Sequence, residues 1–280
     1  MSFLRDIATI TQLTLHEAMR RRILIATLIC GGGFLVVYGI GMHFIFKSAH
    51  GSNASFVEHR MMVTMITLAG LYAVNFLTVM SAVLLPIDTL SGDIASGVIQ
   101  TVASKPISRS SIVLGKWLGY WLVTAGYLLL TAGGVILIAR FVGHHQVPGI
   151  HIGLPLMMLE ATVLVSLSLA GGTRFSTVTN GVVGFGMFGL AFIGNWVEQI
   201  GTLARNDAAR YVGTVASLIM PSDSMWQLAA SNMQPAIMRQ LSITPFSPAS
   251  VPSPAMVWWA VGYCVLMIAL AIRGLSKRAL

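Results

Sequence analysis

Six long apolar runs, separated by polar segments, dominate the pattern of hydrophobic and polar positions along the chain. A helix needs about 20 mainly apolar residues to cross a bilayer, and each run is close to that length or longer. The pattern therefore predicts an all-α membrane protein in which residues 23–280 form one transmembrane domain of six helices. The predicted spans are Ile23–Phe46, Met61–Leu85, Ile112–Ala139, Gly153–Ala170, Val178–Val197 and Pro254–Ile272.

Residues 1–22 follow a different pattern. Apolar side chains recur three or four positions apart, as at Phe3, Ile7 and Ile10, and polar residues occupy many of the positions between them. This spacing places the apolar side chains on one face of a helix. Because this amphipathic helix directly precedes a span, we expect it to lie flat in the membrane interface.

A long insertion, residues 198–253, separates the fifth and sixth spans. Its apolar positions predict two short, half-buried helices on the outer side, which could be re-entrant or lie on the outer surface. Pro221 is expected to end the first of them, and Ser222 or Asp223 is expected to cap the second.

The distribution of charge predicts the orientation. Only 9% of the residues are charged and 55% are hydrophobic, whereas soluble domains carry about 25% charged residues. A net charge of +8 would suggest nucleic acid for a soluble protein, but in a membrane protein Lys and Arg gather on cytoplasmic loops and contact anionic lipid. The predicted topology places eleven basic residues on the side of the termini and six on the other. We therefore expect a multi-pass plasma-membrane protein of the bacterial inner membrane, with both termini cytoplasmic and no nucleic-acid partner.

The stretch Asp88–Trp117 lies between the second and third spans. It is a long polar, Gly/Ser-rich segment that combines acids with a basic cluster. The predicted topology places residues 88–110 on the cytoplasmic face as an inner loop. Trp117, Tyr120 and Trp121 then stand near the inner end of the third span, where they predict an aromatic belt.

The sequence of this stretch, SGDIASGVIQTVASKPISRSSIVLGKWLGYW, resembles the signature of type-2 ABC transporter permeases. In that family an acid–glycine stretch leads into a short coupling helix, a Lys-Pro-x-Ser-Arg turn, and a Gly-Lys pair that opens the third span. The acid corresponds to Asp93, the coupling helix to Val98–Ala103, and the turn to Lys105–Arg109. The family often has Glu at the position of Asp93, and Gly-Thr where this chain has Gly97-Val98.

The resemblance implies a permease subunit of an ATP-driven exporter, coupled through residues 88–110 to a separate ATPase. It also implies a homodimer served by two ATPase subunits, in which ATP and Mg belong to the partner. This chain would hold no cofactor and would not be an enzyme. The residues expected to transmit force from the ATPase are Asp93, Gly97, Val98, Ile99, Val102, Lys105, Pro106, Arg109 and Lys116. Pro106 would fix the backbone after the coupling helix, and Ser108 would cap the third span.

Glu160 is the only acid well inside a predicted span. An intramembrane carboxylate is a functional-site candidate, although it can also stay protonated or bond to a neighbouring helix. Arg140 is a conceivable partner for it. Asn75 is a weaker candidate for the substrate pathway, and Asn75 and Asn180 could each simply bond between helices.

Alternative functions remain open at this stage. Glu160 could carry protons in an ion-coupled secondary transporter, although we find no convincing internal repeat. The chain could also be a membrane factor for the maturation or assembly of other proteins. His144, His145 and His151 in one outer loop allow copper contact or an intramembrane hydrolase, but a polar loop explains them more simply and we assign no metal site. No Walker loop, HExxH or GxSxG motif is present.

Overall fold

The computed structural model describes residues 2–50, 56–97, 107–235 and 251–277. Within these residues the regular elements are all helices, and six of them are long and apolar enough to cross a membrane. The helices are α1 (Ser2–Arg20), α2 (Arg22–His50), α3 (Phe56–Leu84), α4 (Thr89–Ala95), α6 (Arg109–Phe141), α7 (Ile150–Gly172), α8 (Thr177–Leu203), α9 (Asp207–Ile219), α10 (Ser222–Asn232) and α12 (Ala255–Ser276). The prediction of an all-α membrane protein with six spans is confirmed.

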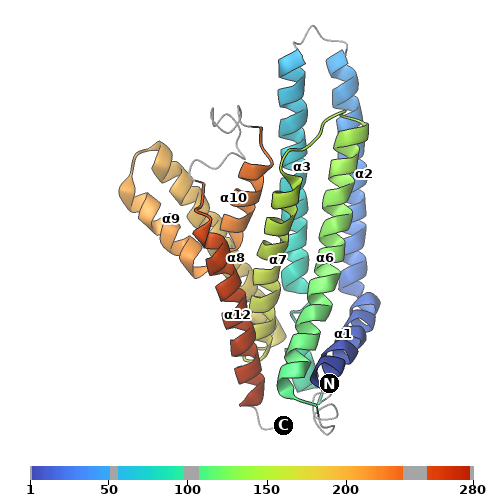
Figure 1. Cartoon of the computed structure of the whole chain (residues 1–280), viewed down its shortest axis with the longest axis vertical. Helices are drawn as coiled ribbons and strands as arrows, with labels where there is room; N and C mark the ends of the chain where they lie inside the picture. Colours follow the sequence, from blue (N-terminus) through green and yellow to red (C-terminus); the bar gives the residue numbers. More distant parts are fainter. Residues whose placement is uncertain (1, 51–55, 98–106, 236–250, 278–280) are drawn as a thin grey trace.

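The spanning helices form an elongated bundle with both chain termini at one end (Figure 1). We call this the terminal end, and the opposite end, near the connection of α2 to α3, the far end. α7 is the central helix: 67% of its most apolar stretch is buried, against 11% for α2. It contacts α3, α6, α8, α10 and α12. α2 lies at the edge of the bundle, where its apolar side chains face the lipid.

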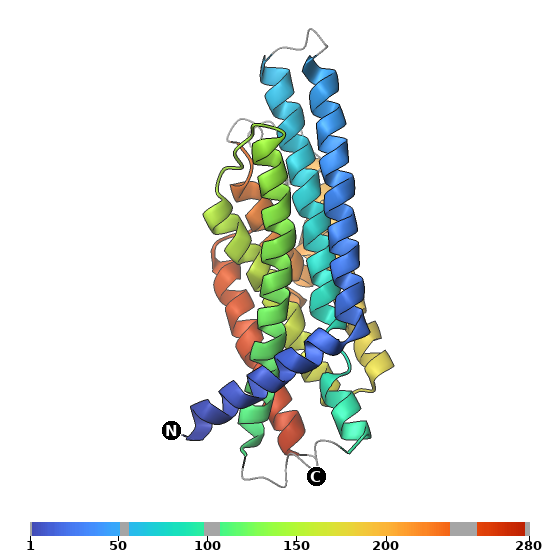
Figure 2. The ribbon, with the colours of Figure 1, turned by 90° about the vertical axis from the view of Figure 1, so that its right-hand side faces the viewer.

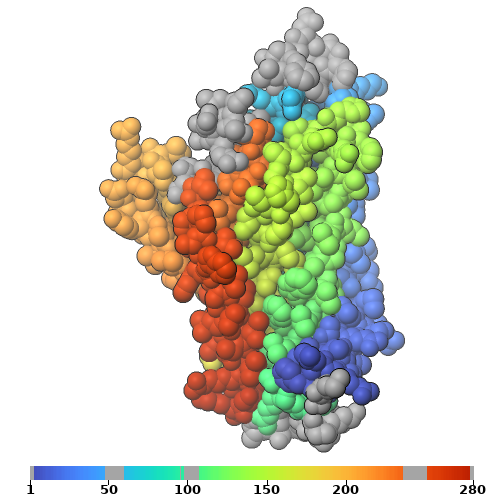
Figure 3. Space-filling model, viewed as in Figure 1, coloured from blue at the N-terminus to red at the C-terminus, as the bar shows by residue number. Residues whose placement is uncertain are grey.

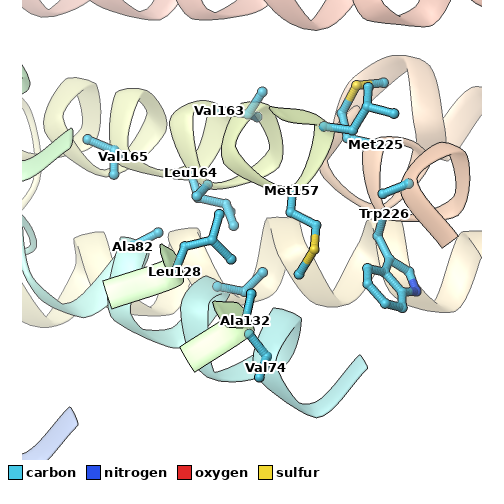
Figure 4. Packing of buried hydrophobic residues seen from close by; sticks show 14 of the residues in the cluster. Val74, Ala82, Leu128, Ala132, Met157, Val163, Leu164, Val165, Met225 and Trp226 are labelled. Atoms are coloured by element: carbon cyan, nitrogen blue, oxygen red, sulfur yellow. The ribbon is translucent and has the colours of Figure 1, made fainter. Parts of the chain in front are cut away.

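Small and medium-sized side chains fill the space around α7. Leu164 of α7 points toward Leu128 of α6, and Met157 of α7 points toward Ala132 of α6 and has Trp226 of α10 on its other side (Figure 4). Lipid tails are as apolar as leucine, so close van der Waals packing rather than transfer from water holds such helices together. The core is therefore an interlocked contact of α7 with its neighbours.

The N-terminal helix is confirmed, and it crosses the surface of α6 at the terminal end (Figure 2). Two glycines of α6 allow the crossing. A Cβ on Gly115 would stand 2.6 Å from the Cβ of Ile10, and one on Gly119 would stand 2.7 Å from the Cβ of Thr14. Leu4 on the same helix stays exposed, as expected for a helix at the membrane interface.

Two sequence predictions about aromatic residues and outer helices were wrong in detail. Tyr120 is fully buried, while the indole nitrogens of Trp117 and Trp121 donate hydrogen bonds of 2.9 Å to hydroxyls of α7. These residues join helices rather than forming a belt, because their polar atoms find partners inside the bundle. The second outer helix, α10, is almost fully buried rather than half-buried, and among the described residues it has no side-chain cap. Asp223 bonds to Gln227 instead.

The contact of α1 with α6 generates a prediction. Gly115→Ala is expected to lower the free energy of unfolding by about 1–3 kcal/mol, because the added methyl overlaps Ile10. Gly126→Ala is the matched control: it lies on the same helix with no atom within 4 Å of the new Cβ, so it should be neutral or stabilising. Thermal unfolding in detergent measures both. Equal melting temperatures for the two variants would contradict the docking of α1.

Candidate functional site

The start of the 88–110 segment is fixed to α6 by a charged pair. The Lys116 ammonium donates a hydrogen bond to the Asp93 carboxylate on α4 and another, of 3.3 Å, to the carbonyl of Thr89. The Lys116 side chain is only 9% exposed and that of Asp93 is 21% exposed. A lysine so far from water needs such partners, because an unpaired buried charge is costly. The structure thus brings two of the predicted coupling residues into direct contact.

Gly97 redirects the chain after α4. Its φ of +74° lies in the left-handed region, which glycine adopts without strain. Its N–H bonds to the carbonyl of Ile94, the arrangement with which glycine commonly ends a helix. The predicted coupling helix that follows, Val98–Ala103, lies outside the described residues. The same holds for Val98, Ile99, Val102, Lys105 and Pro106, so their roles stay predictions.

The end of the segment is fixed as well. Ser108 caps α6 by accepting a 3.2 Å hydrogen bond from the N–H of Ser111, as predicted. Arg109 donates to the carbonyls of Leu275 and Ser276, at 3.0 and 2.8 Å. These carbonyls belong to the last turn of α12, where a cation is favoured by the helix dipole. Arg109 therefore links the start of α6 to the end of α12.

The 88–110 segment is also bonded to α8, in addition to its contacts with α6 and α12. The hydroxyl of Thr177, at the start of α8, donates a 2.7 Å hydrogen bond to Asp88. The Asn180 amide donates to the carbonyls of Ile87 and Ser168, at 3.1 and 2.8 Å. The interhelical role expected for Asn180 is confirmed. We name the four elements α4, α6, α8 and α12, where they meet at the terminal end, the anchor cluster.

Glu160 lies far from the anchor cluster in sequence and is completely buried in α7. Among the described residues, neither of its carboxyl oxygens has a hydrogen-bond partner, and Asn75 of α3 is its polar neighbour. Arg140, named above as a conceivable partner, is exposed and does not pair with Glu160. The acid that does interact electrostatically with Glu160 is Asp223 of α10. Sequence reasoning treated Asp223 only as a cap.

The outer histidines do not converge on one site. His145 is buried, and its ring lies 3.4 Å from the hydroxyl of Thr64. Burial and the nearby Arg60 guanidinium lower the pKa of His145, which keeps the ring neutral. His144 packs on the ring of Phe46, with centroids 5.7 Å apart. In the described part of the chain, no three His, Cys, Asp or Glu side chains gather as a metal-binding group.

A comparison with protein families finds one family whose model matches nearly the whole chain. Residues 9–280 match the family described as ABC-2 family transporter protein. The chain belongs to this family. A comparison with curated proteins finds no match.

As an ABC-2 family transporter protein, the chain is an integral, multi-pass membrane permease subunit of an ABC transporter. Such subunits are generally non-catalytic and work with an ABC ATPase. The family assignment agrees with the resemblance drawn from the 88–110 segment. It covers the six spans, the anchor cluster and the α9–α10 insertion together.

The Asp93–Lys116 pair of this ABC-2 protein generates a double-mutant test. Asp93→Asn and Lys116→Met should each lower the free energy of unfolding by about 1–3 kcal/mol, because each leaves a polar partner poorly satisfied near the membrane. The double variant should cost clearly less than the two single changes added together. Unfolding in SDS titrations provides the free energies.

The exposed pair Asp207–Arg210 on α9 is the matched control. Because solvent screens this pair, the corresponding cycle should show a coupling close to zero. Additive effects at Asp93 and Lys116 would show that these residues do not stabilise each other.

Proposed function

We propose that this permease subunit is driven through the 88–110 segment, which receives motion from a separate ATPase and passes it to three spans. The observation that supports this most directly is the anchoring of both ends of the segment. Lys116 holds its beginning to α6, and Arg109 holds its end to α12. A loop tied at both ends to rigid helices transmits displacement, whereas a loosely attached loop would absorb it.

The terminal end is the face we assign to the cytoplasm and to the ATPase. It carries α1, the anchor cluster and the majority of the basic residues of the predicted topology. Basic residues favour the cytoplasmic side and its anionic lipids. The host membrane in this proposal is the bacterial inner membrane, and ATP with Mg is bound by the partner.

The assembly we propose is a homodimer with two ATPase subunits. One chain supplies six spans, which make half of a permease, and a second copy is the simplest way to complete it. Transport in the export direction is part of the same proposal, and the resemblance of the 88–110 segment to exporter permeases is its support.

Coupling can be tested without knowing the substrate. The complex would be labelled at Arg210→Cys on exposed α9, in a background where Cys30 and Cys264 are replaced by Ser, and distances between labels would be measured with and without ATP and vanadate. ATP should shift the distance between protomers in the parent protein. Ile99→Glu and Arg109→Glu should abolish the shift, because they disturb the coupling helix and its exit.

Two controls accompany this measurement. Lys47→Glu, on the exposed far end of α2, should keep the ATP-dependent shift. Thermal unfolding separates uncoupling from loss of fold, which matters for Arg109 because of its bonds to α12. An unchanged ATP-dependent shift in both loop variants would overturn the proposed role of the segment, and failure to co-purify any ATPase would overturn the partner.

A second candidate function, proton-coupled transport, is favoured by the buried and unpartnered carboxyl of Glu160. Under the ATP-driven proposal, Glu160→Gln should leave the pH profile of transport unchanged, because the amide keeps the size of the side chain. A proton carrier would instead lose its pH dependence. Transport by reconstituted protein between pH 6 and pH 8 separates the two.

A further inference from the structure

A cavity of about 220 Å³ lies between α8, α9, α10 and the residues that lead into α12. It is separate from the anchor cluster and belongs to the α9–α10 insertion, in the part of the molecule where α9 stands out from the bundle beside α12 (Figure 3). The polar side chains of its wall include Asn195, Glu198, Thr214, Ser217, Asp223 and Gln227. Among the described residues that line it, two are carboxylic acids and none is basic.

Asp223 is held in a fixed position at this wall. The residue is 5% exposed, and the amide of Gln227, one turn later on α10, donates a 3.0 Å hydrogen bond to its Oδ2. Asn195 of α8 is a second polar neighbour of the same carboxyl. The Gln227 amide therefore orients the carboxylate, and a neutral polar group of another helix lies beside it.

The surroundings of Asp223 lack a compensating cation. Among the ion pairs of the described residues, none includes Asp223, Glu198 or Glu160. Arg210, the basic residue of α9, is exposed and paired with Asp207. Burial raises the pKa of Asp223 to about 7, and the second buried acid, Glu160, lies behind it on α7. A bound cation would neutralise this region, since buried charges are normally paired.

We propose that this cavity binds a small organic cation, a primary ammonium group carried on a short aliphatic body. The ammonium would donate to Asp223 and Glu198 and to the hydroxyls of the wall. Met220 and Met256, which also line the cavity, would contact the aliphatic part.

Size and ligand type favour an amine over a metal ion. A cavity of about 150 Å³ holds a molecule such as benzene, so this cavity has room for roughly six to eight non-hydrogen atoms. Ca²⁺ is held by about six to eight oxygen ligands, and the described wall of this cavity offers two carboxylates for it. The described residues contain no group of three His, Cys, Asp or Glu that could hold one.

This site does not depend on the proposed coupling to an ATPase, because a resting protomer already carries the cavity. Its test therefore uses the purified full chain without any ATPase. The ligand is 1,4-diaminobutane, which has six non-hydrogen atoms and could reach both carboxylates. The matched control ligand is 1,4-butanediol, which has the same length and no charge.

Isothermal titration calorimetry in nanodiscs should show saturable binding of the diamine and none of the diol at pH 8. Affinity should fall about tenfold at pH 6, because Asp223 becomes protonated while the amine, with a pKa near 10, stays charged at both values. The other titratable groups that face Asp223 or share its cavity are Glu160 on α7, Glu198 on α8 and Tyr72 on α3.

Three substitutions test whether the diamine binds in this cavity. Asp223→Asn should abolish binding at both pH values while keeping an acceptor for Gln227, and Glu198→Gln should weaken it at least fivefold. Asp207→Asn, at an exposed carboxylate outside the cavity, should bind like the parent protein. Glu198 is partly exposed, so Glu198→Gln decides the case if Asp223→Asn does not fold.

Several results would contradict an amine site in this cavity. Equal binding of the diol, full binding by Glu198→Gln, or a response to Na⁺ or Mg²⁺ but not to the diamine would overturn the amine site. Absence of any diamine binding to the folded parent protein would overturn it too. None of these results bears on the coupling segment, so the two proposals fail separately.

Discussion

The neutralisation of one buried ammonium organises the terminal end of this permease. Lys116 lies within a spanning helix and is almost fully enclosed, so it requires an anion and a carbonyl close by. Asp93 and Thr89 supply them, and this fixes α4 against α6. The bonds of Asp88 to Thr177 and of Arg109 to α12 then extend the same arrangement to two further helices. The two described ends of the 88–110 segment are thereby joined to the bundle.

The rest of the bundle follows a different physical rule. In lipid, backbone polar groups must be satisfied within the chain, which leaves helices as the available form for these spans. Polar side chains then concentrate where helices meet, as in the tryptophan–hydroxyl bonds between α6 and α7. The contact of the α9–α10 insertion with α7 departs from this rule, because Asp223 of α10 and Glu160 of α7 are buried without a basic partner among the described residues. We attribute that departure to ligand binding.

The sequence was sufficient for the six spans, since each apolar run is long and bounded by polar or helix-ending residues. The ends differ by a few residues: the second span was expected to cover Met61–Leu85, and α3 covers Phe56–Leu84. Local signals such as the Ser108 cap were also readable, because a cap depends on only a few neighbouring residues. The resemblance of the 88–110 segment correctly indicated the family.

Contacts between distant segments could not be read from the same patterns. Asp93 and Lys116 were both selected, but nothing in their spacing showed that they pair. Asp223 sits in a short helix with a weak apolar pattern, and its burial depends on packing against α7 and α8, which periodicity does not reveal. Trp117 and Trp121 fit an aromatic belt by position, yet hydroxyls on α7 give their indoles interior partners. Tertiary packing therefore determines which partners these side chains contact.

The central claim is that residues 88–110 touch the ATPase. A photo-crosslinking amino acid placed at Ile99, in the co-purified complex, tests it most directly. We predict a crosslink from this position to the ATPase subunit, and none from the same amino acid at His144, at the far end of α6. Crosslinking from His144 but not from Ile99 would contradict the assignment of the terminal end as the driven face.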